Sequence, residues 1–170
     1  MKSSFAIPFV GLKQGIHEFE FDIDKSFFES LPYSLIENGR LSAYLELEKK
    51  ETMLIAQLDV VGFIFTDCDR CTEPLTQEIE GDMTLYYTFG EEESEDENLL
   101  VLAPESYQID LTQHLYELIS LSLPAKMVHE EGECNEEMVE LINKYQQPTS
   151  DSKPDDDEID PRWSALKNLN

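Results

Sequence analysis

The sequence predicts an α+β fold in which an antiparallel β-sheet, open or barrel-like, packs with two or three helices. Apolar and polar residues alternate with period two through the first half of the chain, and the apolar spacing becomes helical after residue 110. After residue 145 the chain is mostly polar and acidic. We therefore expect an α+β domain over residues 1–145, followed over residues 146–170 by a disordered acidic tail that ends in a short helical peptide.

The strands are predicted from side-chain alternation. Apolar residues occupy odd positions in residues 19–23, 41–47 and 79–89, and most even positions are polar. This pattern is typical of an antiparallel sheet with one face on the core and the other in water. Residues 53–65 are apolar on both parities, which predicts a central strand. Residues 24–31 resemble a short helix, with Asp24 as its N-cap.

Two further helices are expected in the second half. Residues 110–123 carry leucine and isoleucine at helical spacing, and Asp110 with Gln113 three positions later resembles a capping box. Pro124 is expected to end this helix. Residues 135–145 place their apolar side chains on one side of a helix.

Two acidic segments separate or follow these elements. Residues 91–97 are all acids except Ser94, which predicts a disordered loop between strands. The tail is acidic up to its last segment, where Trp163, Leu166 and Leu169 form a short apolar stripe that follows Arg162. This peptide either docks on a partner or packs back on its own domain.

The charge balance limits the classes of partner. Asp and Glu total 37 against 12 Lys and Arg, giving a formal charge of -25. Because nucleic acid binding relies on Lys and Arg at the phosphates, direct RNA or DNA binding is disfavoured. An acidic surface attracts basic proteins, although acidity can also serve solubility alone. An RNA-binding module remains as an alternative, with a basic patch centred on Arg70.

The chain has three cysteines, no segment that resembles a cleaved signal and no run of 18 apolar residues. These features lead us to expect a cytoplasmic protein with no membrane contact. In a reducing compartment a Cys-x-x-Cys pair favours metal or redox chemistry over a structural disulfide.

Cys68 and Cys71 are spaced so that both thiolates can face one metal ion. His129 and Cys134 lie far along the chain, with Gly132 to relax the turn between them. Together the four would close a tetrahedral structural zinc site. Closing so long a loop costs about 4 kcal/mol, less than the roughly 10–16 kcal/mol that zinc contributes in finger peptides.

Two alternatives stay open for the cysteines. In the first, the two halves do not meet in space, which leaves Cys68 and Cys71 as turn thiols and His129 exposed among glutamates. A thiol redox protein using Cys68 and Cys71 is the other alternative. Redox pairs of this kind usually precede a helix, but a strand pattern follows here, and the neighbouring acids should raise the thiol pKa.

The sequence offers little for catalysis. His17 lies in a strand pattern and is expected at the surface, while His114 lies in a helix with no nucleophile nearby in sequence. There is neither a glycine-rich phosphate loop nor a Ser/His/Asp motif. We therefore expect a protein that is not an enzyme.

The order of several segments resembles the YceD family, the large ribosomal RNA subunit accumulation proteins. The segments are Ile-His-Glu-Phe-Glu-Phe at 16–21, Cys-x-x-Cys-x-x-Pro at 68–74, the acidic loop, the helix closing in Leu-Ser-Leu-Pro at 121–124, and Asp-Pro-Arg-Trp-x-x-Leu at 160–166. They span nearly the whole chain, and the cysteine pair is the most specific of them.

The resemblance implies a bacterial or organellar cytosolic protein needed for normal levels of large-subunit ribosomal RNA. A non-enzymatic ribosome-biogenesis factor is therefore the expected function, with a basic ribosomal protein or assembly factor as partner. Many members of the family carry a second cysteine pair after the helix. Here residues 127–135 offer only His129 and Cys134, so the resemblance does not imply a four-cysteine site.

Overall fold

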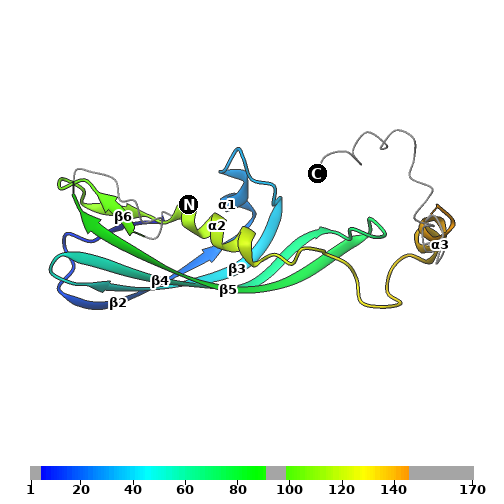
Figure 1. Cartoon of the computed structure of the whole chain (residues 1–170), viewed down its shortest axis with the longest axis horizontal. Helices are drawn as coiled ribbons and strands as arrows, with labels where there is room; N and C mark the ends of the chain where they lie inside the picture. Colours follow the sequence, from blue (N-terminus) through cyan, green and yellow to red (C-terminus); the bar gives the residue numbers. More distant parts are fainter. Residues whose placement is uncertain (1–4, 91–98, 146–170) are drawn as a thin grey trace, which may run out of the picture. The chain divides into compact units, whose positions relative to one another are not determined.

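The computed structural model describes residues 5–90 and 99–145, and the chain divides into two compact units, Met1–Asn135 and Glu136–Asn170. The first unit contains a five-stranded sheet of order β2-β3-β4-β5-β6 and a two-stranded sheet of β1 and β7 (Figure 1). The strands are β1 Ala6–Pro8, β2 Gly15–Ile23, β3 Asn38–Lys49, β4 Met53–Asp67, β5 Pro74–Phe89, β6 Leu99–Leu102 and β7 Gln108–Asp110. The helices are α1 Lys25–Glu29, α2 Thr112–Ser122 and α3 Glu136–Tyr145. The predicted α+β fold is confirmed.

The large sheet is open, so the barrel-like alternative is wrong. β2 and β6 end the strand order and do not pair with each other. The pairs from β2 to β5 are antiparallel as predicted, but β5 and β6 pair in parallel, with Tyr86 opposite Leu99. The four consecutive apolar residues of β6 carry no alternation from which its direction could be predicted.

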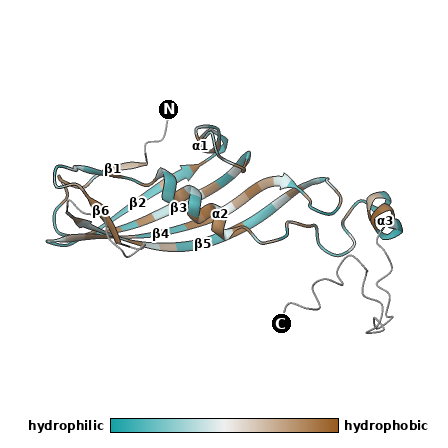
Figure 2. Cartoon of the chain, turned by 45° about the horizontal axis from the view of Figure 1, so that its top comes forward, coloured by the Kyte–Doolittle hydropathy of each residue, from teal (hydrophilic) through white to brown (hydrophobic). Residues whose placement is uncertain are grey.

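The alternating residues form the core. Leu41, Ala43, Leu45 and Leu47 of β3 are buried, and the last three lie opposite Val60, Leu58 and Ala56 of β4. β4 is the central strand, as predicted. Bands of hydrophilic and hydrophobic residues follow one another along the strands in Figure 2. Since β-strand side chains point alternately to two faces, one face of the sheet carries the core.

Two helices cover that face. α1 and α2 lie on the same side of the sheet (Figure 1). Asp24 caps α1 as predicted, accepting from the backbone N–H of Ser26 at 2.8 Å. α1 buries Phe27 and Phe28, and α2 buries Leu115, Leu118 and Ile119.

Two glycines allow neighbouring elements to lie close to the sheet strands. Gly62 has φ +152, and a Cβ there would lie 2.3 Å from the carbonyl oxygen of Arg40 on β3. A Cβ on Gly81 of β5 would lie 2.0 Å from Oγ of Ser122, at the end of α2. The second contact sets how closely α2 lies on the sheet, and α2 leads directly into the segment that carries His129 and Cys134.

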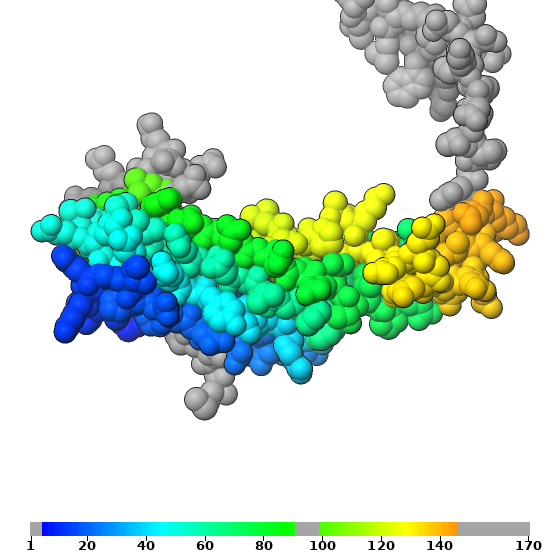
Figure 3. All heavy atoms as spheres, turned by 90° about the horizontal axis from the view of Figure 1, so that it is seen from below, coloured from blue at the N-terminus to red at the C-terminus, as the bar shows by residue number. Residues whose placement is uncertain are grey.

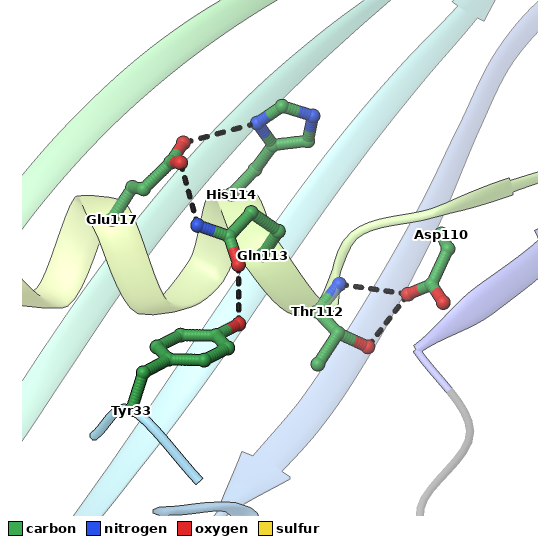
Figure 4. Close-up of polar contacts among 6 residues, drawn as sticks. All are labelled: Tyr33, Asp110, Thr112, Gln113, His114 and Glu117. Carbon is green, nitrogen blue, oxygen red and sulfur yellow. Dashed lines mark hydrogen bonds and ion pairs between the residues drawn. The ribbon is translucent and has the colours of Figure 1, made fainter. Parts of the chain in front are cut away.

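The predicted capping box at the start of α2 is wrong. Asp110 instead accepts from the N–H of Thr112 at 2.9 Å and from its hydroxyl at 2.6 Å (Figure 4). Gln113 turns away, donating to Glu117 at 2.8 Å and accepting from the hydroxyl of Tyr33. Tyr33, from the loop after α1, thus binds the Gln113 side chain that a capping box would use. α2 ends before Pro124, as predicted.

α3 belongs to the second unit and begins within one residue of its predicted start. None of its residues is buried. No helix in the described part of the chain is long and apolar enough to cross a membrane. The predicted loop at 91–97 and the tail peptide with Arg162, Trp163 and Leu166 lie outside the described residues. The boundary at residue 145 therefore stays a prediction.

Candidate metal centre

The first half of the centre is the turn between β4 and β5. The N–H of Cys68 donates to the carbonyl of Glu73 at 2.8 Å, and the N–H of Thr72 donates to the carbonyl of Cys68 at 2.9 Å. Thr72 has φ 59, in the left-handed region that tight turns use. The N–H of Arg70 points at Sγ of Cys68 at 3.4 Å. The turn thus holds Cys68 and Cys71 on one side, both 1% exposed.

The second half is the segment that follows α2. Its Met127 exchanges two hydrogen bonds with Asp69 in the turn. The N–H of Asp69 donates to the carbonyl of Met127 at 2.8 Å, and the N–H of Met127 donates to the Asp69 carboxylate at 2.7 Å. Gly132 has φ +91, which makes a sharp turn available between His129 and Cys134. The side-chain amide of Asn135 donates to Glu73 at 3.2 Å.

The structure brings together all four side chains predicted as ligands. One ligand atom from each of Cys68, Cys71, His129 and Cys134 lies within 4.8 Å of every other, an arrangement that could hold a metal ion. Sγ of Cys68 and Sγ of Cys134 are 3.9 Å apart. Nδ1 of His129 lies 3.3 Å from Sγ of Cys71 and 3.9 Å from Sγ of Cys134.

These separations fit a tetrahedral ion. With Zn–S near 2.3 Å and Zn–N near 2.0–2.1 Å, tetrahedral geometry places two sulfurs about 3.8 Å apart and a sulfur and a nitrogen about 3.5 Å apart. The three distances given above differ from these values by a few tenths of an ångström, and the other ligand atoms lie within 4.8 Å of one another. Three thiolates and an imidazole suit a soft or borderline metal rather than magnesium or calcium, which prefer oxygen.

The surroundings orient the ligands. Nε2 of His129 lies 3.1 Å from the carbonyl oxygen of Pro74. Because a carbonyl only accepts, this contact selects the tautomer with the proton on Nε2, which leaves the lone pair of Nδ1 facing the sulfurs. The guanidinium of Arg70 lies 3.8 Å from Sγ of Cys134 and places positive charge beside the thiolates.

The thiols differ in acidity. Burial acts to raise the pKa of Cys68, but hydrogen bonds from backbone groups of Cys71, His129 and Arg70 outweigh it and lower that pKa to about 6. Burial also opposes ionisation of Cys71, whose pKa is nevertheless lowered by backbone groups of Asn135 and Glu73. Burial and the two neighbouring thiols raise the pKa of Cys134. The expectation that nearby acids raise the pKa of the Cys68–Cys71 pair is therefore wrong.

The pKa of His129 is raised, chiefly by the hydrogen bond to Pro74. The raised pKa values of Cys134 and His129 oppose binding of a cation here, whereas the lowered pKa values of Cys68 and Cys71 favour it.

The other predicted residues lie elsewhere. His17 lies opposite Leu47 on the core-facing side of β2, half-buried, with Nε2 2.8 Å from the carbonyl of Lys13. His114 contacts Glu117 at 3.4 Å on α2 (Figure 4). Arg70 lies beside the sulfurs rather than in a basic patch, and its neighbours Asp69 and Glu73 are acidic and exposed.

Sequence reasoning missed the groups that support the ligands: the Asp69 carboxylate, the Pro74 carbonyl and the amide of Asn135. Asp69 alone gave a signal, since an aspartate inside a turn often binds a backbone N–H. Its partner here is 58 positions away, a pairing that only the tertiary fold creates.

The comparisons with known proteins give one match. The model of a family described as "Large ribosomal RNA subunit accumulation protein YceD" matches residues 56–170. The matched range contains both halves of the metal centre. Neither the search among curated proteins nor the search among solved structures found a match to this chain.

Proposed function

The chain belongs to the YceD family, and from this premise we propose that it is a non-enzymatic ribosome-biogenesis factor that supports accumulation of large-subunit ribosomal RNA. It acts through contacts with a basic ribosomal protein or assembly factor, in the cytoplasm where ribosomes are assembled. The observation that carries the proposal is the family match over residues 56–170, most of the described sheet included. The net charge of -25 supports a protein partner over direct binding to RNA phosphates.

The proposal includes a structural zinc ion held by Cys68, Cys71, His129 and Cys134. Zinc bound by four protein ligands has no open position for substrate, so it would act as a cross-link. It would tie the β4–β5 turn to the segment after α2, which the hydrogen bonds between Asp69 and Met127 already align. What supports zinc is the donor set and its spacing.

Metal analysis of protein purified without chelator tests the zinc site. We expect about one zinc per chain and its loss in Cys71→Ser. Substoichiometric zinc that is the same in wild type and Cys71→Ser would remove the metal from the proposal. Cobalt loaded in place of zinc should give the visible absorption of a tetrahedral thiolate site, which distinguishes this cluster from adventitious binding to surface carboxylates.

Capture from cell extract at low and moderate salt tests the protein-contact role. We expect ribosomal or ribosome-assembly proteins that are lost as salt rises, because salt screens attraction between exposed charges. Recovery of none at either salt would contradict the role. The tail residues Arg162, Trp163 and Leu166 remain proposed partner contacts, to be tested by replacing all three with alanine in the same capture.

The two rival functions have less support. A redox Cys-x-x-Cys gains its reactive thiol from a helix N-terminus, but here β5 begins at Pro74, directly after the turn. The lowered pKa of Cys68 is compatible with a reactive thiol as well as a metal ligand. Alkylation of the metal-loaded protein separates them, because zinc-bound thiolates should react slowly and redox thiols quickly. Binding of an RNA probe, lost in Arg70→Ala, would favour the RNA-binding alternative.

A further inference from the structure

The outer face of the large sheet is the set of alternate positions in β2–β5 that point away from α1 and α2. Figure 3 views the molecule from that side, and the strands themselves form the surface there. On this face β4 exposes three apolar side chains in sequence: Val61 at 44%, Phe63 at 43% and Phe65 at 40%. A strand apolar on both parities normally lies between two covered faces. Within the described residues, neither a helix nor a second sheet covers the outer face of β4.

Carboxylates surround this apolar stripe. The acidic residues at outer-face positions are Glu18, Glu20, Asp22, Glu46, Glu48, Asp59, Asp67, Glu78, Glu80 and Asp82. Arg40 is the only basic residue at these positions. Among the described residues, Glu48 alone of this set has an ion pair, with Lys50 at 3.1 Å. The stripe therefore lies in a field of negative charge that the described part of the protein does not neutralise.

The strand register places like charges directly opposite each other. Glu18 lies opposite Glu46, and Asp59 lies opposite Asp82. Such pairs destabilise a sheet, whereas opposite charges at the same places would stabilise it. The arrangement opposes folding and favours a ligand with several positive charges, because cations placed beside each of the two pairs would relieve its repulsion.

The surface is hollowed where the acids meet an aromatic ring. Tyr44, 44% exposed, lies opposite Glu20 on β2 and Asp59 on β4. An open hollow of about 530 Å³ lies here, lined by Glu18, Phe19, Glu20, Tyr44, Leu45, Glu46 and Asp59. A guanidinium fits this combination better than an ammonium, because its plane stacks on a tyrosine ring while its N–H groups pair with carboxylates.

We propose that the outer face of β2–β5 is the docking surface for an arginine-rich segment of a basic protein. Arginine of the partner stacks on Tyr44 between Glu20 and Glu46, and apolar side chains of the partner cover Val61, Phe63 and Phe65. The inference rests on the proposed function, which requires a basic protein partner, and adds where that partner binds and which cation it presents. The stripe and the carboxylates together exclude RNA, whose phosphates the face repels, and a second copy of this chain, whose face carries the same charge.

The test uses the full chain and a fluorescent peptide in which arginine and valine alternate, with lysine–valine and glutamate–valine peptides for comparison. Binding is measured by anisotropy at moderate salt. Tyr44→Ile keeps β propensity but removes the ring, and the double variant Glu20→Gln, Glu46→Gln removes two charges. We expect each to weaken binding of the arginine peptide about tenfold.

The matched control is the double variant Glu29→Gln, Glu105→Gln, which removes the same charge from exposed positions off the face. We expect it to change binding less than about twofold. An equal effect in the control would show attraction to net charge alone and overturn the proposal. Equal affinity for the lysine peptide would overturn the assignment of arginine.

A second measurement does not depend on variant folding. Nuclear magnetic resonance of the labelled full chain during peptide titration should shift the amides of Tyr44 and its neighbours on β2 and β4. Shifts confined to residues 91–97 or 146–170 would instead place the basic segment on the acidic loop or tail. An RNA probe that shifts the face, or a dimer that Phe63→Thr makes monomeric, would also overturn the proposal.

The two proposals fail in different ways. If wild type captures no ribosomal or assembly protein, the proposed function fails, whatever the peptide does. If wild type captures such proteins and the double variant Glu20→Gln, Glu46→Gln captures them equally well, the function stands and the docking surface is wrong.

Discussion

Replacing Asp69 by alanine tests whether the turn and the segment after α2 are aligned before the metal binds. The Asp69 carboxylate accepts the N–H of Met127 at 2.7 Å. A hydrogen bond to a charged group contributes about 1.5–3 kcal/mol, and solvent exposure reduces this value here to about 1–1.5 kcal/mol. Without the bond the segment carrying His129 and Cys134 samples more conformations, and the metal must select the competent one. We expect zinc affinity to fall about five- to tenfold.

Competition with a chromophoric chelator measures that affinity directly. Asp67→Ala is the matched control, because it removes the same charge from an exposed residue two positions away at the end of β4. Asp69→Asn should restore much of the affinity, since it keeps an oxygen acceptor at the same place. If Asp69→Ala and Asp67→Ala weaken zinc binding equally, the loss is one of charge near a cation, and the alignment argument is refuted.

Three further predictions follow from the fold and the centre. Gly81→Ala should lower the free energy of unfolding in urea by about 1–3 kcal/mol, because the new Cβ would clash with Oγ of Ser122. Adding Ser122→Ala should recover part of that loss, and strictly additive effects of the two substitutions would contradict this packing. His129→Ala should weaken zinc binding more than about 100-fold, while His114→Ala should leave it unchanged by chelator competition; similar losses would contradict the ligand set. Chelation should speed hydrogen exchange at the amide of Met127 about tenfold or more, while amides of β3 stay protected; global acceleration would show that the fold depends on the metal.

Local patterns predicted most of the sheet. The alternation at 41–47 arises because one face of the strand meets the core and the other meets water. The strand could therefore be predicted without knowing the order of the strands in the sheet. β6 could not be oriented in this way because its residues Leu99–Leu102 are uniformly apolar. The open sheet could not be told from a barrel, since closure depends on whether the two edge strands meet.

The candidate ligands were predictable from residue chemistry, but their supports were not. Two cysteines in one turn suggest a metal by spacing alone, whereas the bond between Asp69 and Met127 exists only because α2 returns the chain to that turn. The pKa of Cys68 is lowered by backbone hydrogen bonds to its sulfur. The directions of those N–H groups cannot be predicted from the charges of the neighbouring side chains. Likewise, the apolar residues of β4 predicted a central strand, and only the structure shows which of its faces the helices leave open.

The apolar core and the sulfur cluster share no residue: none of the three cysteines belongs to the buried cluster that fills the space between the sheet and its helices. Selection can therefore act on each separately during evolution. We therefore expect that a change of ligand at position 129, such as His129→Cys, leaves the packing of the interior leucines unaltered.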